Sequence, residues 1–399
     1  MTIYFLFKEA TLDSFPIFAK NSWRVNTEPQ IITHSTHQKH EEGEEVKCTF
    51  ETIPQALETN EVLLSQPYWM YGAEMGVNEH EVVIGNEPVY TTETKLGSGL
   101  TGQDLVRLGL ERGDSAKQSL DVIINLLEKH GQRGECGYDN HQWFFHNSFL
   151  IADPGEAFII ETADKWWIAE KLKDFKIKSI SNEFTVKGKG DRRRDGIINY
   201  AIEKGCCKNE DDFNFAQVFS KEKIPDNFPL KVNLSPSIEI LTKHMGEITI
   251  EHVIEILRRE QNESGNSLRC AGSQISHLKY LKKSIHWFTG GPYPKYNLIK
   301  PYIFPVENQK VNNAGPYSKI NPEWFWTQNE RFLGENLSEL KTQKYMNELN
   351  AIERELRSEV RNLVHEQDNY RKEDFVKEFE KINQESWEKA YEIISLKPT

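Results

Sequence analysis

The chain has 399 residues, of which 38% are hydrophobic and 28% charged, a composition typical of a globular protein with one large core or two to three smaller domains. Its net charge of −12 argues against nucleic acid and anionic membranes as partners. No apolar run approaches the roughly 18 residues of a membrane span, and the first residues lack the basic start of a signal peptide, so we expect no membrane insertion.

The cysteines and histidines indicate neither disulfide nor metal chemistry. The five cysteines are unevenly spaced and include no CxxC pair, which is typical of free thiols in a reducing compartment. We therefore expect a cytoplasmic protein without a cofactor. His34, His37 and His40 lie in a polar stretch that we interpret as a solvated loop rather than a metal site.

Apolar patterns in the first part of the chain predict two strands and, later, a pair of helices. Residues 3–7 and 15–19 are apolar runs joined by a polar connection, as in paired strands. Residues 101–130 predict two helices, because leucines and isoleucines recur at helical spacing. Thr101 and Asp104 resemble a capping box at the start of the first helix.

The second part of the chain changes period. Residues 147–182 alternate apolar and polar side chains and predict an antiparallel meander. Residues 191–260 are polar and helical in pattern, and the charged run Asp191–Asp195 is interpreted as a solvated helix start. A further β region covers about 269–304, and two or three amphipathic helices follow from Asn321 onward.

This order of elements predicts α+β layers rather than repeated βαβ units. We expect a domain of residues 1–306 and a helical C-terminal extension, residues 307–399, that packs on the core or on a partner.

The sequence holds none of the motifs GxSxG, GxxxxGK[ST], GxGxxG or HExxH. One mechanism leaves almost no internal motif: the side chain of an N-terminal residue attacks, and its free α-amine, with a reference pKa of about 7.7–8, accepts the proton. Such a site also needs oxyanion donors and a cation. Oxyanion donors and a cation of this kind would be found at strand ends, and the predicted strand ends carry Asn86, Asn182 and Arg269. Polar residues are also common at strand ends for structural reasons alone.

Several stretches resemble the secernins, relatives of the bacterial dipeptidase-A family within the N-terminal-nucleophile hydrolases. The resemblance runs from about residue 5 to residue 304. It implies a four-layer αββα sandwich of two antiparallel sheets between helix layers. It also implies a cysteine made N-terminal by removal of a short leader and acting on peptide or other amide bonds. The matching stretches are GAEMGVNEH, GNEPVYT, LTGQDLVRLGLERG, NLLEKHGQRG, HNSFLIADPGEAFIIETADKWW, ISN, EDDFNFAQVFS and KPYIF.

The resemblance assigns roles to particular residues. Lys20-Asn21-Ser22 matches the family's KNS motif, so Lys20 resembles the basic residue beside the nucleophile. Asn182 resembles the asparagine of the oxyanion hole, and Arg269 resembles an active-site arginine opposite the nucleophile. Asn86, in the strand end Gly85–Glu87, resembles a further oxyanion donor that faces the pocket.

The nucleophile departs from the family pattern. Ile3 stands where the cysteine is expected, and no cysteine precedes Cys48. Three explanations remain open: Thr2 becomes the nucleophile once Met1 is removed, the protein is catalytically silent with a retained pocket, or the natural start is longer and carries a cysteine.

Two smaller departures lie near the expected pocket. Trp23 replaces a residue that is acidic in many relatives, and Glu81 replaces a residue that is usually glycine. If that glycine has a positive φ, Glu81 carries strain of about 1 kcal/mol.

The sequence thus predicts a secernin-like amidohydrolase of the dipeptidase type that acts on a small peptide or amide. Thr2 is the predicted nucleophile, Asn182 and Asn86 are oxyanion donors, and Arg269 and Lys20 bind or polarise the substrate. The alternative is a catalytically silent protein of regulated exocytosis or trafficking, with a homo-oligomer or a trafficking partner held through the C-terminal helices.

Overall fold

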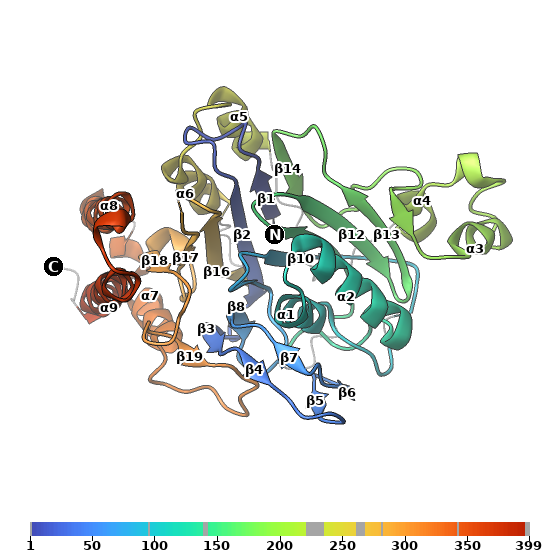
Figure 1. Ribbon diagram of the computed structural model, residues 1–399, viewed down its shortest axis with the longest axis horizontal. Helices are drawn as coiled ribbons and strands as arrows, with labels where there is room; N and C mark the ends of the chain where they lie inside the picture. The colour runs from blue at the N-terminus through green and yellow to red at the C-terminus, as the bar shows by residue number, and fades with distance from the viewer. Residues whose placement is uncertain are drawn as a thin grey trace.

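Two sheets lie face to face between layers of helices (Figure 1). The computed structural model describes residues 2–94, 96–138, 143–220, 235–260, 268–280, 282–340 and 343–395. The predicted four-layer αββα sandwich is therefore confirmed. The apolar alternation of the central strands produces it, because each strand presents one row of side chains to the other sheet and the next row to a helix layer.

One sheet has six strands and contains the N-terminal strand. Its order is β14 (Ile177–Ile180), β1 (Thr2–Leu6), β2 (Ile17–Val25), β16 (Leu268–His277), β17 (Ile285–Phe288) and β18 (Lys300–Tyr302). On β1, Ile3 and Phe5 pack in the core between the sheets, whereas Tyr4 and Leu6 pack toward the helices.

The second sheet has nine strands and presents its inner face to the first. Its order is β15 (Arg192–Arg193), β13 (Trp166–Lys171), β12 (Ala157–Ala163), β11 (His146–Ala152), β10 (Val83–Val89), β9 (Met75–Asn78), β8 (Val62–Pro67), β3 (Gln30–Ser35) and β19 (Asn312–Asn313). Two short pairs lie apart from it: β4 (Gln38–Lys39) with β7 (Glu58–Thr59), and β5 (Glu45–Lys47) with β6 (Thr52–Pro54).

Helices cover the outer face of each sheet (Figure 1). The nine-stranded sheet packs against α1 (Gly102–Arg112) and α2 (Ala116–His130). The predicted capping box is confirmed, since the Asp104 backbone N–H donates to Thr101 Oγ1 at 3.0 Å and the Thr101 N–H donates to Asp104 Oδ2 at 3.0 Å. The six-stranded sheet is covered by α5 (Ser235–Lys243), α6 (Ile250–Arg259) and the C-terminal helices α8 (Gln343–His365) and α9 (Lys372–Ser395). The helix α7 (Phe325–Leu340) contacts β16 through the hydrogen bond from Trp326 Nε1 to the Ala271 carbonyl.

The C-terminal helices are joined to the sheet by side-chain hydrogen bonds as well as by apolar contact. Trp387 Nε1 of α9 donates to Tyr302 Oη at 2.9 Å, and Asn383 Nδ2 donates to the Pro301 carbonyl at 2.7 Å. Both acceptors belong to β18, so α9 is fixed along the edge of the six-stranded sheet.

Two expectations differ from the structure. The predicted meander holds for β11, β12 and β13, but the last strand, β14, pairs with β1 in the other sheet. The run Asp191–Asp195 does not start a helix: Arg192 and Arg193 form the short strand β15 on β13, and α3 (Ile197–Glu203) begins only after Gly196, whose φ of +80° interrupts regular structure. A further short helix, α4 (Phe215–Phe219), follows, and residues 221–234 of the predicted helical region lie outside the described part of the chain.

Over the ranges that the structure describes, no helix combines the length and the apolarity required to cross a membrane.

Glu81 has the positive φ that its replacement of a family glycine predicts. Its φ is +66°, in the turn between β9 and β10, where the Glu81 N–H donates to the Asn78 carbonyl at 3.0 Å. A side chain with a Cβ atom is strained in this region by roughly 1 kcal/mol.

Replacing Glu81 with glycine should therefore raise the free energy of unfolding by about 0.5–1 kcal/mol, because glycine adopts this φ without a steric penalty. Denaturant unfolding measures the effect. The matched control is Glu45→Gly in strand β5, which should lower stability because glycine weakens a regular strand. A loss of stability for Glu81→Gly would contradict the strain.

Candidate active site

The first strand places Thr2 and Ile3 on opposite faces of the six-stranded sheet. Thr2 pairs with Asn21 of β2, and Ile3 pairs with Lys20. Cross-strand partners share a face and successive residues alternate between faces. Thr2 and Asn21 therefore face the helix layer, where Asn21 Nδ2 donates to the Leu257 carbonyl of α6 at 2.8 Å. Ile3 and Lys20 face the other sheet.

Lys20 is buried between the sheets and is bound by strand β10. Its Nζ donates to the Asn86 carbonyl at 2.6 Å and to Glu87 Oε1 at 2.8 Å. Both side chains of this ion pair have no exposed surface. Burial raises the pKa of Glu87 above its ordinary value, although the charge of Lys20 opposes that rise. Lys20 is therefore a cation fixed by two oxygen atoms of the opposite sheet.

Asn182 approaches the same segment of β10. Its Nδ2 donates to the Pro88 carbonyl at 3.0 Å, and its Oδ1 has no hydrogen-bond partner among the described residues. Lys20 and Asn182 thus meet at residues 86–88. The Asn86 side chain lies on the other face of β10, toward α1, where its amide contacts Asn147 Oδ1 at 2.8 Å. At this meeting point Asn86 contributes a backbone carbonyl and not its amide.

Thr2 belongs to a different polar cluster, beneath α6. Its side chain is fully buried, and within the described residues its Oγ1 has no hydrogen-bond partner. On the same face Ser273 Oγ donates to Asn21 Oδ1, and Tyr4 Oη donates to Glu260 at the end of α6. Burial raises the pKa of Glu260. A buried hydroxyl without a partner is uncommon in folded proteins.

Arg269 is bound to the C-terminal helices. Its guanidinium forms an ion pair with Glu330 of α7, and its Cζ lies 4.9 Å from the ring centre of Trp326 and 5.4 Å from that of Tyr293. It pairs in register with Arg24, whereas Ser273 on the same strand is the residue that pairs with Asn21. The structure therefore does not place Arg269 beside Lys20.

A buried arginine in the same region is absent from the sequence-based prediction. Arg24 is almost fully buried, and its Nη1 lies 2.8 Å from Glu74 Oε1 while its Nη2 binds Glu28 and the Cys136 carbonyl. Burial alone would lower the pKa of Arg24, but the two carboxylates raise it by a larger amount, so the net shift is upward. The signal in the sequence was the alternation along β2, which places Lys20, Ser22 and Arg24 on one face.

None of the buried cysteines is suited to replace the nucleophilic cysteine that the family resemblance places at residue 3. All five cysteines are unpaired, and burial raises the pKa of the Cys48, Cys136 and Cys270 thiols, that of Cys270 to about 12. A thiol that stays protonated at neutral pH is a poor nucleophile. Trp23, in the position that is acidic in many relatives, packs in an apolar cluster with Cys270 and Trp143.

The larger cavities lie elsewhere. Four cavities with volumes of about 410 to 740 Å³ are lined by other residues than the five predicted site residues. Across the described parts of the chain, no three His, Cys, Asp or Glu side chains gather as metal ligands would.

The αββα sandwich is the architecture of the N-terminal-nucleophile hydrolases, the class that the sequence resemblance implies. Residues 17–229, more than half of the chain, match the model of Peptidase family C69. The protein belongs to this family, which comprises the dipeptidase A and secernin proteins, so at family level it is a peptide or amide hydrolase.

Solved structures with a similar course of the chain are distant in sequence. A variant of conjugated bile acid hydrolase from Clostridium perfringens is 12% identical, with a TM-score of 0.47 over 80% of this chain and 99% of that one. Penicillin V acylase from Agrobacterium tumefaciens is 10% identical, with a TM-score of 0.42 over 80% of this chain and 100% of that one.

Replacing Lys20 with methionine should lower the free energy of unfolding by about 3–5 kcal/mol, because it leaves the buried Glu87 without its counter-charge. The double variant Lys20→Met/Glu87→Leu should recover most of this loss, since no buried charge then remains. Denaturant unfolding of the two single variants and the double variant measures the coupling.

Lys8→Met is the matched control, because the exposed Lys8–Glu9 pair, at 4.0 Å, should contribute less than about 1 kcal/mol. Equal effects of Lys20→Met and Lys8→Met would show that the buried pair does not stabilise the fold.

Proposed function

We propose that this protein hydrolyses the peptide bond of dipeptides or similarly small amides, with Thr2 as the nucleophile once the preceding peptide bond has been cleaved. The observation that carries the proposal is the Thr2 hydroxyl, which lies at the start of strand β1, buried and without a hydrogen-bond partner among the described residues. Membership of Peptidase family C69 supports the reaction class.

In this mechanism Thr2 Oγ1 attacks the carbonyl carbon of the substrate, and its proton passes to the α-amine of Thr2. The tetrahedral intermediate breaks the C–N bond, and the leaving amine takes that proton. Water, deprotonated by the same α-amine, then attacks the acyl ester. The C–Oγ1 bond breaks, the amine returns its proton to Thr2 Oγ1, and the carboxylic acid leaves. The reference pKa of an α-amine, about 7.7–8, suits both proton transfers near neutral pH.

The other predicted residues have three roles. Asn182 is the proposed oxyanion donor, because its amide retains one N–H beyond the one bound to the Pro88 carbonyl. It lies on the inter-sheet side of β1 while the Thr2 side chain faces α6, so the proposal requires the substrate carbonyl to lie past the end of β1, between the two groups. Arg269 is the proposed binding group for the substrate carboxylate, because its guanidinium already binds one carboxylate, that of Glu330. Lys20 and the backbone of Asn86 are positioning residues that fix β1 and β2 against β10.

A second candidate function is that of a catalytically silent protein with a trafficking role, in which the C-terminal helices bind a partner. The observation that favours it is the register of β1. Ile3, which has no nucleophilic atom, pairs with Lys20, and Thr2 faces the other side of the sheet. Trp23 in its apolar cluster fits the same interpretation.

Thr2→Ala decides between these candidates. If Thr2 is the nucleophile, turnover of a panel of dipeptides should fall by at least about 10³-fold, because no other group replaces the attacking oxygen. Thr2→Ser should retain activity, since a serine hydroxyl performs the same attack. Intact-mass analysis of the purified protein shows whether the Thr2 amine is free.

The control is Thr11→Ala, which removes another nearly buried threonine hydroxyl, bound to the Phe15 carbonyl at 2.8 Å and distant from Thr2 along the chain. It should leave turnover unchanged. Dipeptide hydrolysis that survives Thr2→Ala would exclude Thr2, and a blocked Thr2 amine without any turnover would favour the silent protein.

A further inference from the structure

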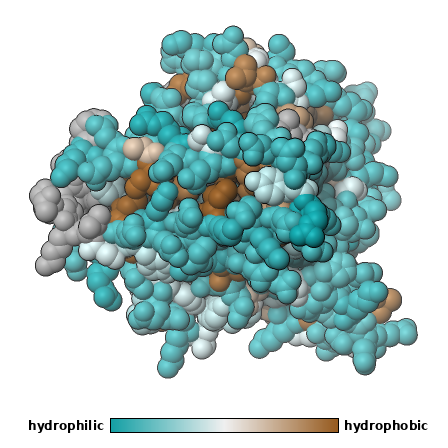
Figure 2. All heavy atoms as spheres, turned by 60° about the vertical axis from the view of Figure 1, so that its left-hand side comes forward, coloured by the Kyte–Doolittle hydropathy of each residue, from teal (hydrophilic) through white to brown (hydrophobic). Residues whose placement is uncertain are grey.

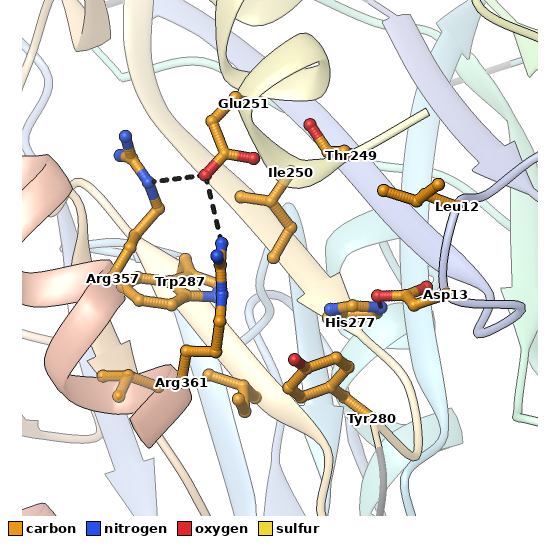
Figure 3. A pocket seen from close by; sticks show the side chains of 12 residues that line it. Leu12, Asp13, Thr249, Ile250, Glu251, His277, Tyr280, Trp287, Arg357 and Arg361 are labelled. Carbon is orange, nitrogen blue, oxygen red and sulfur yellow. Dashed lines mark hydrogen bonds and ion pairs between the residues drawn. The ribbon is translucent and has the colours of Figure 1, made fainter. Parts of the chain in front are cut away.

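A cavity of about 410 Å³ lies between the six-stranded sheet and helices α6 and α8, at the far end of β16 from Arg269. Figure 2 shows that, on the side of the molecule that carries the C-terminal helices, apolar residues lie in a hollow between hydrophilic surfaces. The volume falls within the roughly 300–1,000 Å³ of small-molecule sites. Figure 3 shows the side chains that line the cavity.

The floor of the cavity is apolar. Trp287 and Ile285 come from β17, Ile250 from the first turn of α6, and Val360 from α8. All but Ile250 are buried, and all four belong to the hydrophobic cluster that joins the sheet to the C-terminal helices or pack against it. A flat aromatic surface with branched side chains around it suits an apolar body of about the size of one ring.

One wall of the cavity carries two arginines and one glutamate, and Arg357 is also paired with Glu353 outside the cavity lining, its Nη1 lying 3.3 Å from Glu353 Oε2. Glu251 Oε1 accepts from Arg357 Nε at 3.2 Å and lies 3.6 Å from Arg361 Nη2 (Figure 3). Two guanidinium groups thus share one carboxylate oxygen. Burial alone would raise the pKa of Glu251. Hydrogen bonds from its own backbone N–H and from Thr249, together with the charges of the two arginines, lower it by a larger amount, so the net shift is downward. Arg361 is 56% exposed and keeps most of its N–H groups free for a further anion.

On the opposite wall the polar side chains pair with each other. His277 Nε2 lies 3.1 Å from Asp13 Oδ2, and Tyr280 stacks beside the imidazole ring with 4.5 Å between the ring centres. The pKa of Asp13 is lowered, since the hydrogen bond and charge of His277 outweigh the effect of burial. Asp13 is therefore already bound by His277, and Arg361 is the group left to attract a ligand.

A second observation points to a ligand that accepts hydrogen bonds. Trp287 is only 4% exposed, and its indole Nε1 has no hydrogen-bond partner among the described residues. A buried donor without an acceptor is unfavourable by roughly 1–3 kcal/mol, so an acceptor bound in the cavity would remove that penalty.

We propose that this cavity is a binding site for a small molecule that consists of an apolar, ring-sized body and one carboxylate. The body lies on Trp287 and Ile285, and the carboxylate binds the Arg361 guanidinium as a bidentate acceptor. The site is separate from the proposed nucleophile. Thr2 pairs with Asn21, and Asn21 pairs with Ser273. Ser273 precedes the cavity-lining His277 by four residues along β16.

Titration calorimetry of the full chain with 3-phenylpropionate tests the proposal, with 3-phenylpropionamide as the neutral analogue. We expect saturable binding of the acid, at least about tenfold tighter than that of the amide, because charge-assisted hydrogen bonds are about twice as strong as neutral ones. Arg361→Met should weaken binding of the acid by about tenfold and abolish the preference over the amide.

Arg371→Met is the matched control, because Arg371 is an exposed arginine outside the cavity that pairs with Asp374 at 2.6 Å. It should bind the acid as the parent protein does. Trp287→Phe keeps an aromatic floor without the N–H and should weaken binding roughly two- to tenfold. Thermal unfolding checks that each variant is folded.

The proposal is overturned if the acid shows no saturable binding, if the amide binds equally well, or if Arg361→Met and Arg371→Met bind alike. These readouts measure binding, so loss of peptide hydrolysis in Thr2→Ala does not affect them.

Discussion

The structure depends on two buried ion pairs that cross the interface between the sheets. Lys20 and Arg24 project from β2 and bind Glu87 of β10 and Glu74, the residue that precedes β9 in the opposite sheet. A charge buried between two sheets is tolerated only with its partner in place. A slip of β2 by one residue would turn both cations toward the helices and leave both carboxylates unpaired. The ion pairs therefore set which face of β2, and through pairing which face of β1, meets the second sheet.

This register separates the groups that a hydrolase of this class would use. Lys20 and Asn182 meet at residues 86–88 between the sheets, whereas Thr2 lies beneath α6 with Asn21. Ile3 takes the place next to Lys20 and extends the apolar core. A mechanism through Thr2 therefore draws its immediate surroundings from the helix side of the sheet, where burial favours the uncharged form of Glu260.

The C-terminal helices contact both the candidate site residue Arg269 and the cavity beside α6. Glu330 of α7 binds Arg269, and Trp326 of the same helix donates through Nε1 to the Ala271 carbonyl of β16 at 3.1 Å. Arg357 and Arg361 of α8 form a wall of the second cavity. These helices are thus more than a cover for the sheet, since they supply the partner of one candidate site residue and the cations of a separate binding site.

The sequence alone determined the features that depend on local order. Apolar runs indicate β1 and the start of β2, and the Thr101–Asp104 box starts α1. The resemblance to a family glycine raised the positive φ that Glu81 has. Only the tertiary structure decided which strand pairs with which: β14 leaves its meander for β1, and Arg192 and Arg193 join β13 instead of a helix. The partners of Lys20 and Arg269 were likewise undetermined, since a side chain's periodicity gives its face but not the distant residue that meets it there.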